Sequence, residues 1–150
     1  MASVVMMVGT ADYDLMAFAN QISASGPNKI TISQSTSSEP SISSRAMSTL
    51  KNIQGGESLY VVAHGNGPSW GSASANAVTV DAGRMIDILH VNLQKNVLVY
   101  LCICESWASG VALKGKRPDL EVWAARRTPK LAWNSTSRTV DDSSGNFRKV

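Results

Sequence analysis

The sequence predicts an α/β protein built as a three-layer sandwich, with a mostly parallel sheet covered by helices on both faces. Short apolar runs alternate along the chain with segments of helical periodicity, which is the pattern of strand-helix-strand units. Several of these runs are continuously apolar, as expected for strands that are buried on both faces of a parallel sheet. With 150 residues the chain is about the size of one domain.

The first half of the chain predicts three strands and two helices. Leu15, Phe18 and Ile22 recur at helical spacing after the first apolar run. A stretch rich in Ser and Thr has the composition of a mobile loop, and a glycine pair turns the chain into the third strand. In order, the predicted elements are a strand over residues 4–8, a helix over 11–23, a strand over 29–33, a loop over 34–44, a helix over 45–53 and a strand over 59–63.

The second half begins with residues 65–71, whose content of Gly, Pro and Ser argues against regular structure. An amphipathic helix follows, because the apolar residues from Ala82 to Leu93 fall on one face. The last part of the chain is mostly polar, so we predict one domain over residues 1–133 and a polar C-terminal tail over residues 134–150. The predicted strands of this half cover residues 97–103, 120–125 and 131–133.

Composition and charge narrow the class of protein. Hydrophobic residues make up 43% and charged residues 17% of the chain, which is typical of a globular domain. The formal charge of +3 is modest. The basic residues of the last third predict a solvated basic face or an anion site, and they lack the aromatic residues and motifs of nucleic-acid-binding proteins. We therefore expect no nucleic-acid partner.

The compartment is predicted from the apolar runs and the cysteines. No run approaches the roughly 20 apolar residues that span a bilayer, so we expect no membrane association. The first run lacks a preceding basic segment and is more typical of a strand than of a signal peptide. A disulfide between Cys102 and Cys104 is not expected, because side chains two apart on a strand lie about 7 Å apart along the chain. These features fit a cytoplasmic protein, or an effector secreted without a cleavable signal peptide, and leave the oligomeric state open.

Two of the apolar runs each end on a side chain with catalytic chemistry. The strand over residues 59–63 runs into His64, and the strand over residues 97–103 runs into Cys104. Because the carboxyl ends of parallel strands meet at one edge of a sheet, we expect the imidazole and the thiol to lie side by side. A thiol attacks carbonyl groups as the thiolate, and a neighbouring imidazole takes its proton. This pairing predicts a cysteine peptidase with Cys104 as nucleophile and His64 as general base.

Gly65 supplies a third part of the predicted catalytic site. Because glycine has no side chain, its backbone N–H can face a substrate carbonyl group. Together with the N–H of Cys104, the N–H of Gly65 would form an oxyanion hole, which stabilises the charge that develops on the carbonyl oxygen during attack.

These motifs resemble a known family. Ala63-His64-Gly65 after an apolar strand, an intervening helix, and an apolar strand that leads into Cys104-Glu105-Ser106 are similar to the caspase-like superfamily of cysteine peptidases, clan CD. Among its bacterial members the likeness is to CHAT-type peptidases and to the self-processing domains of large toxins. The resemblance spans residues 59–125. It implies an endopeptidase that hydrolyses peptide or protein substrates through an acyl-enzyme, acting in self-processing or as an effector.

The resemblance also implies where substrate binds. In this family the segment after the nucleophile and the next strand build the specificity pocket, which here points to Ser106, Trp107 and Trp123. The tryptophans predict an apolar or shallow pocket. No metal or cofactor is expected, although the related toxin domains are activated by inositol hexakisphosphate, which would suit the cationic last third of this chain. Ile103 departs from the family, which usually has Ala or Gly at this position.

Other interpretations of the same residues stay open. Catalytically inactive relatives and nucleotide- or anion-binding α/β modules are the alternative function, although the chain lacks a phosphate-binding loop motif. A serine hydrolase is disfavoured because the Gly-x-Ser-x-Gly motif is absent. We prefer Cys104 to Cys102 as nucleophile because Cys102 falls within the strand. Zinc binding is disfavoured by the spacing of the available ligands, which are Cys102, Cys104, His64 and His90.

Overall fold

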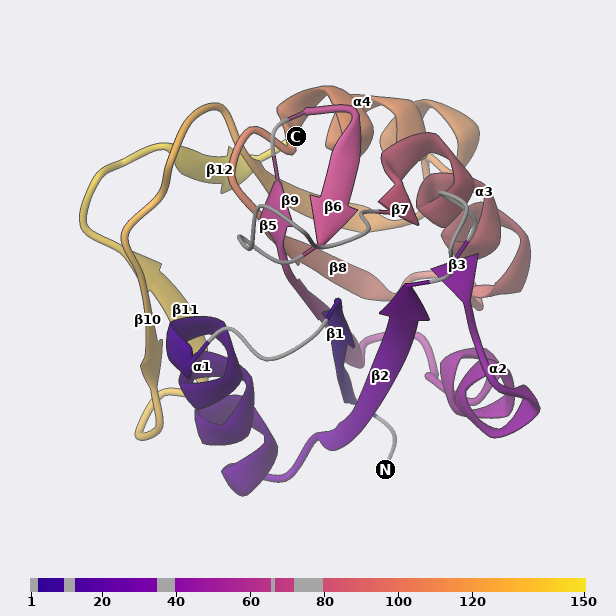
Figure 1. Cartoon of the computed structure of the whole chain (residues 1–150), viewed down its shortest axis with the longest axis horizontal. Coiled ribbons are helices and arrows are strands. Elements are labelled where there is room, and N and C mark those ends of the chain that lie inside the picture. Colours follow the sequence, from indigo (N-terminus) through magenta and orange to yellow (C-terminus); the bar gives the residue numbers. More distant parts are fainter. Residues whose placement is uncertain (1–2, 10–12, 35–39, 66, 72–79) are drawn as a thin grey trace.

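The computed structural model has an α/β architecture, with a seven-stranded sheet between two covering layers (Figure 1). It describes residues 3–9, 13–34, 40–65, 67–71 and 80–150. The predicted loop over residues 34–44 and the start of the predicted first helix therefore lie partly outside the described residues.

The helices are α1 (Tyr13–Ala24), α2 (Ser44–Lys51), α3 (Ala82–Asn92) and α4 (Trp107–Lys116). The strands are β1 (Val4–Val8), β2 (Asn28–Gln34), β3 (Pro40–Ser41), β4 (Ser58–Val62), β5 (His64–Gly65), β6 (Ser69–Gly71), β7 (Val80–Asp81), β8 (Leu98–Cys102), β9 (Glu121–Ala125), β10 (Leu131–Asn134), β11 (Thr139–Asp142) and β12 (Phe147–Lys149).

The large sheet has the strand order β12-β9-β8-β4-β1-β2-β3. Its five central strands run parallel, whereas β12 and β3 pair antiparallel at the two edges. All residues of β1 are buried, as are all but the first of β4. Burial on both faces explains why these strands are continuously apolar in sequence. The predicted fold class is confirmed.

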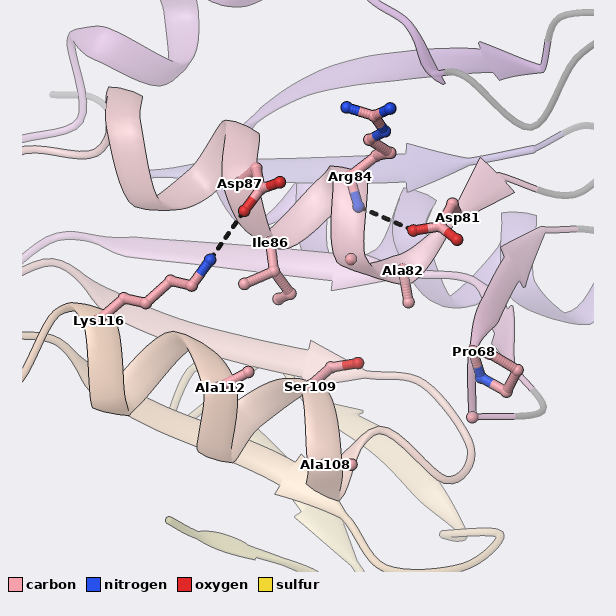
Figure 2. Close-up of a pocket in the computed structure, with 12 residues that line it drawn as sticks. Pro68, Asp81, Ala82, Arg84, Ile86, Asp87, Ala108, Ser109, Ala112 and Lys116 are labelled. Atoms are coloured by element: carbon pink, nitrogen blue, oxygen red, sulfur yellow. Dashed lines mark hydrogen bonds and ion pairs between the residues drawn. The ribbon is translucent and has the colours of Figure 1, made fainter.

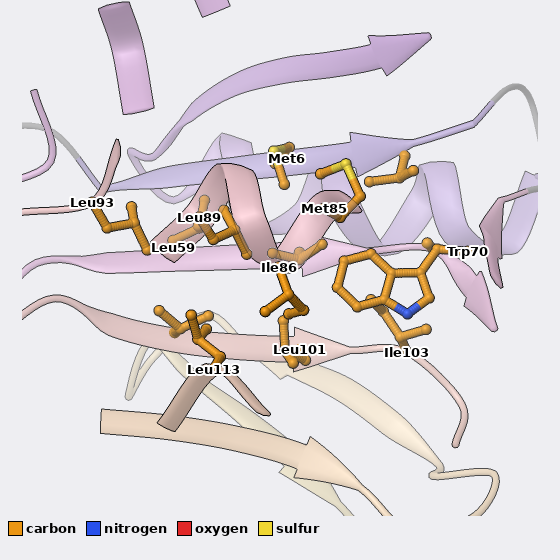
Figure 3. Close-up of a cluster of buried hydrophobic side chains, with 14 of the residues drawn as sticks. Met6, Leu59, Trp70, Met85, Ile86, Leu89, Leu93, Leu101, Ile103 and Leu113 are labelled. Carbon is orange, nitrogen blue, oxygen red and sulfur yellow. The ribbon is translucent and has the colours of Figure 1, made fainter. Parts of the chain in front are cut away.

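Apolar side chains form one cluster on each face of the sheet. The first cluster includes Met6, Val61 and Leu101 and is covered by α2, α3 and α4. Figure 2 shows α3 and α4 side by side on this face, and Figure 3 shows the side chains packed beneath α3. The second cluster includes Val62 and Cys102 and is covered by α1 and the hairpin of β10 and β11. Successive residues of a strand therefore face different layers.

Aromatic rings cross the second face in one row. Tyr60 stacks on Tyr100 with 5.0 Å between ring centroids, and Tyr100 stacks on Trp123 at 6.1 Å. Trp133 of the hairpin meets Tyr60 edge-on at 5.4 Å, and its indole N–H donates to Ser25 Oγ at 2.8 Å. Burial raises the pKa of Tyr100 to about 12. These contacts fix the hairpin to the sheet and to the end of α1.

The predicted polar tail, residues 134–150, is instead part of the fold. β11 pairs with β10, and β12 pairs with β9 at the edge of the large sheet. Phe147 is buried, and the N–H of Val150 donates to the carbonyl oxygen of Val122 at 2.8 Å. The composition is misleading here because edge strands and exposed hairpins turn most of their side chains to solvent. The boundary predicted after residue 133 is therefore wrong.

Two further parts of the fold have little signal in the sequence. α4 contains Gly110 and Gly115, which lower helix propensity, and its buried residues are only Gly110 and Leu113. The segment 65–71, predicted to be irregular, lies outside the described residues at position 66, but its Gly65 and Ser69–Gly71 belong to a small antiparallel sheet with the order β5-β6-β7. Each of these strands has only two or three residues, which is too short to show an alternating pattern.

Candidate active site

His64 follows the carboxyl end of β4 and forms β5 together with Gly65. β5 pairs antiparallel with β6, which places His64 opposite Gly71 and Gly65 opposite Trp70. Trp70 is fully buried, and Figure 3 shows its indole beside Ile103. The short hairpin that carries the imidazole is thus fixed to the core.

Cys104 lies in the turn that follows β8. The N–H of Ile103 donates to the carbonyl oxygen of Leu101 at 2.8 Å, which bends the chain where the strand ends. Glu105 has a φ of 55°, in the left-handed region, and its N–H donates to the carbonyl oxygen of Arg127 at 3.1 Å. The partly exposed thiol is therefore held on a turn at the carboxyl edge of the sheet, beside the segment that leaves β9.

The segments of His64 and Cys104 belong to neighbouring strands. β4 and β8 pair in parallel, and their register ends with Val62 opposite Cys102. His64 and Cys104 each come two positions further along the chain, just beyond the ends of β4 and β8. Both side chains line one pocket of about 210 Å³ on the α1 side of the sheet.

Gly65 packs directly against the turn that carries the thiol. A Cβ atom added to Gly65 would lie 2.6 Å from the carbonyl oxygen of Cys104, and it would also overlap the side chain of Ile103. A side chain at position 65 would therefore separate the two segments. Ile103, the departure from the family pattern, is itself buried, so its size is accommodated in the core.

The pocket is completed by residues distant in sequence. α1 contributes Asp14, Leu15 and Phe18, and Pro129 and Leu131 come from the segment between β9 and β10 and from β10 itself. The lining is mostly apolar, and Asp14 adds a carboxylate in the exposed first turn of α1. The sequence has no signal for these residues, because only tertiary packing brings α1 over the strand ends.

Cys102 lines the same pocket but is almost completely buried, with 3% of its surface exposed. Burial raises the pKa of its thiol well above the usual range. Since the thiolate is the reactive form, Cys102 is the weaker candidate nucleophile.

Ser106, predicted to contact substrate, is fully buried. Its hydroxyl donates to the carbonyl oxygen of Leu101 at 3.2 Å and accepts from the N–H of Ala125 at 3.0 Å. Because both bonds lie within the protein, the hydroxyl joins the carboxyl ends of β8 and β9 and offers no surface to a substrate. In this structure Ser106 supports the turn rather than lining the pocket.

The two predicted tryptophans lie away from the pocket. Trp107 begins α4, and the guanidinium carbon of Arg126 lies 4.5 Å from its ring centroid. Trp123 lies within β9 in the aromatic row, where its indole N–H donates to Glu121 Oε2 at 3.2 Å. Neither is among the described residues that line the pocket of His64 and Cys104. The apolar walls expected from the tryptophans come from α1, Pro129 and β10 instead.

Of the four side chains considered for zinc, His64, Cys102 and Cys104 line one pocket, and His90 lies apart from them. Cys102 faces the α1 layer, whereas His90 lies in the last turn of α3, which covers the opposite face. Within the described part of the chain, no group of three or more His, Cys, Asp or Glu side chains is arranged to hold a metal ion. None of the described helices is both long and apolar enough to cross a membrane.

No protein-family profile and no curated protein matches this chain. Among solved structures it is similar to a secreted C11 cysteine protease from Bacteroides thetaiotaomicron in complex with an irreversible peptide inhibitor, with a TM-score of 0.44 and 11% sequence identity. The match covers 84% of this chain and 49% of the protease, so the chain spans about half of that protein. At this level of similarity the α/β assignment rests on the strand order of the chain itself. The match gives no support to the CHAT-type and toxin resemblances.

Proposed function

We propose that this chain is a cysteine peptidase in which Cys104 is the nucleophile and His64 the general base. The observation that carries the proposal is the pocket at the carboxyl edge of the sheet, which both side chains line. The close packing of Gly65 against the carbonyl oxygen of Cys104 supports it, because this packing holds the two segments together. The buried thiol of Cys102 leaves Cys104 as the accessible sulfur.

The reaction follows from these roles. His64 takes the proton of the Cys104 thiol, and the thiolate attacks the carbonyl carbon of the peptide bond. The C–N bond breaks as the imidazolium gives its proton to the leaving amine, and the acyl group stays on sulfur as a thioester. Water then attacks the thioester with His64 as base, which releases the acid and restores the thiol. No metal or cofactor is needed.

The backbone near the thiol would stabilise the negative charge on the carbonyl oxygen. The N–H groups of Gly65 and Cys104 are the expected donors. One such donor typically contributes about 10²- to 10³-fold in rate.

The pocket lining suggests the substrate residue whose side chain it receives. Leu15, Phe18 and Leu131 offer apolar walls, and Asp14 offers a negative charge. A long side chain with an apolar stem and a cationic end matches both features. We therefore expect peptide or protein substrates that are cleaved after Lys or Arg rather than after acidic residues.

The nucleophile is tested by alkylation with a thiol-reactive peptide probe near neutral pH, read as intact-protein mass. The wild type and Cys102→Ala should take one label quickly, and Cys104→Ala should take none. His64→Ala should label about 100-fold more slowly, because the thiol loses its general base. The matched control is His90→Ala, which removes the other histidine of the chain and should label at the wild-type rate.

Two results would contradict this mechanism. Equal labelling rates in wild type and His64→Ala would mean that the histidine does not activate the thiol. A label found on Cys102 would show that Cys104 is not the reactive thiol. A parallel series with inositol hexakisphosphate tests the activator: faster wild-type labelling would assign that role, and an unchanged rate would exclude it.

A further inference from the structure

A groove of about 730 Å³ lies between α3 and α4, on the face of the sheet opposite to α1 (Figure 2). It is more than three times as large as the pocket of about 210 Å³ that holds Cys104. Ala82 and Gly83 on α3 face Ala108 and Ala112 on α4, and these small residues leave the space between the helices unfilled. The mechanism above makes no use of this groove.

The two ends of the groove differ. At one end Lys116 Nζ lies 2.9 Å from Asp87 Oδ1, and this ion pair joins α4 to α3. At the other end, near the carboxyl edge of the sheet, the groove is lined by Gly67 and Pro68. Figure 2 shows Pro68 and Ala108 at this second end and Lys116 at the first. The groove is thus bounded by the ion pair on the side away from the candidate active site.

The sides of the groove continue the two segments of the candidate active site. Gly67 and Pro68 belong to the hairpin that begins with His64, and the carbonyl oxygen of Pro68 accepts from the N–H of Ala82 at 2.9 Å. Ala108 lies in the first turn of α4, directly after the turn that carries Cys104. The chain leaving the candidate base therefore forms one side of the groove, and the chain leaving the candidate nucleophile forms the other.

We propose that the groove between α3 and α4 binds the leaving-group half of the peptide substrate, an inference that rests on the proposed peptidase function. His64 must protonate the leaving amine, so this half of the substrate lies against His64 and continues toward Gly67 and Pro68. From Ala108 to Lys116 the helix rises about 12 Å. This length fits three to four extended residues at about 3.3 Å each. Charged side chains also line the groove, but its middle is lined by Ala82, Ile86 and Ala112, which favours small or apolar substrate side chains there.

The test compares two substrates that share one acyl half. A peptide library digested by the wild type supplies a cleaved sequence. One substrate then carries four residues after the scissile bond, and the other carries only an aminocoumarin group. The ratio of kcat/KM for the long substrate to that for the short one reports binding beyond the scissile bond.

The variants are matched on one helix. Ala112→Trp places an indole in the middle of the groove, at an exposed position that can accept it. Val111→Trp makes the same addition one position earlier, at a side chain that is 48% exposed and is not among the described residues lining the groove. Thermal melting checks that both variants fold, and Ala108→Phe at the open end replaces Ala112→Trp if that variant melts early.

We expect the ratio to fall at least about tenfold in Ala112→Trp and to keep the wild-type value in Val111→Trp. An unchanged ratio in Ala112→Trp overturns the groove assignment and leaves the peptidase in place, as does an equal fall in both variants. If the wild type cleaves nothing in the library, the peptidase function fails and the groove loses its role with it.

Discussion

Gly65 permits a closer approach of two chain segments than a side chain would allow. Its Cα faces the carbonyl oxygen of Cys104, and an added Cβ would lie only 2.6 Å from that oxygen. The oxyanion hypothesis requires an accessible backbone N–H at position 65, and the packing gives an independent reason for glycine there. The same residue therefore serves both the fold and the proposed chemistry.

Gly65→Ala is expected to push the β5 hairpin away from the turn of Cys104. Overpacking of this kind costs about 1–3 kcal/mol in the free energy of unfolding, and alkylation of Cys104 should slow as His64 shifts. Urea denaturation and the labelling rate measure the two effects.

The control for this substitution is Gly115→Ala in α4. No described atom lies within 4 Å of a Cβ added to Gly115, so alanine should raise helix stability by about 0.5–1 kcal/mol. If Gly65→Ala kept wild-type stability and the wild-type labelling rate, the close contact between position 65 and Cys104 would not be needed for either.

At the residue scale the sequence identifies side chains that stand at strand ends. His64 and Cys104 can be found because each ends an apolar run, and parallel strands end at one edge. Asp14 could not be found, since its place in the pocket depends on how α1 packs across the sheet. The prediction for Ser106 is corrected because a hydroxyl near the nucleophile can equally serve the backbone of the turn.

At the scale of elements, Asp142 joins the β10–β11 hairpin to the rest of the fold. Its carboxylate accepts from the N–H of Lys130 at 2.8 Å, from the N–H of Phe147 at 2.8 Å and from the hydroxyl of Ser144 at 2.7 Å. Burial opposes ionisation of this carboxyl group, but these hydrogen bonds outweigh it and hold the pKa of Asp142 at about 2. The bond to Lys130 also fixes the segment between Pro129 and Leu131 that closes the pocket.

Asp142→Asn should therefore change stability in a pH-dependent way. A depressed pKa contributes stability that is present above the ordinary value of about 3.9 and is lost as the pH falls toward about 2. At pH 7 the variant should lose about 1–3 kcal/mol of unfolding free energy, and the gap to wild type should narrow as the pH falls from about 4 to about 2. Urea denaturation across this range measures it. The control is Asp141→Asn, a change at the neighbouring exposed residue. If the stability difference between Asp142→Asn and wild type did not change with pH, the role of the Asp142 charge would be contradicted.

The strands and helices differ in how well the sequence predicts them. β1 and β4 are readable because burial on both faces leaves only apolar side chains. α4 is hard to predict because it packs closely against the sheet through a glycine. A Cβ added to Gly110 would lie 2.8 Å from the Cβ of Ala124. Close approach of a helix to a sheet through glycine lowers the helical signal in the sequence while tightening the structure.

At the scale of the whole molecule the two faces of the sheet carry different layers. α2, α3 and α4 cover one face, and α1 with the β10–β11 hairpin covers the other (Figure 1). The candidate active site lies where these layers reach the carboxyl edge, so its pocket draws on residues from Asp14 to Leu131. The proposed substrate path uses both layers, with one side chain in the α1 pocket and the leaving half between α3 and α4. The site is therefore a property of the complete domain rather than of its two motifs.

Removal of residues 134–150 tests how far the domain extends. The deletion removes β11 and β12, leaves β9 as an unpaired edge strand, and removes the hydrogen bond between the Lys130 N–H and the Asp142 carboxylate. Because Phe147 and the bond from Val150 to Val122 also disappear, we expect the shortened chain to lose its cooperative thermal transition and the fast labelling of Cys104. Phe147→Ala in the full chain is the graded comparison and should cost about 3–5 kcal/mol. A chain of residues 1–133 that melts cooperatively near the full-length temperature would restore the tail interpretation, since the large sheet would then be stable without its β12 edge.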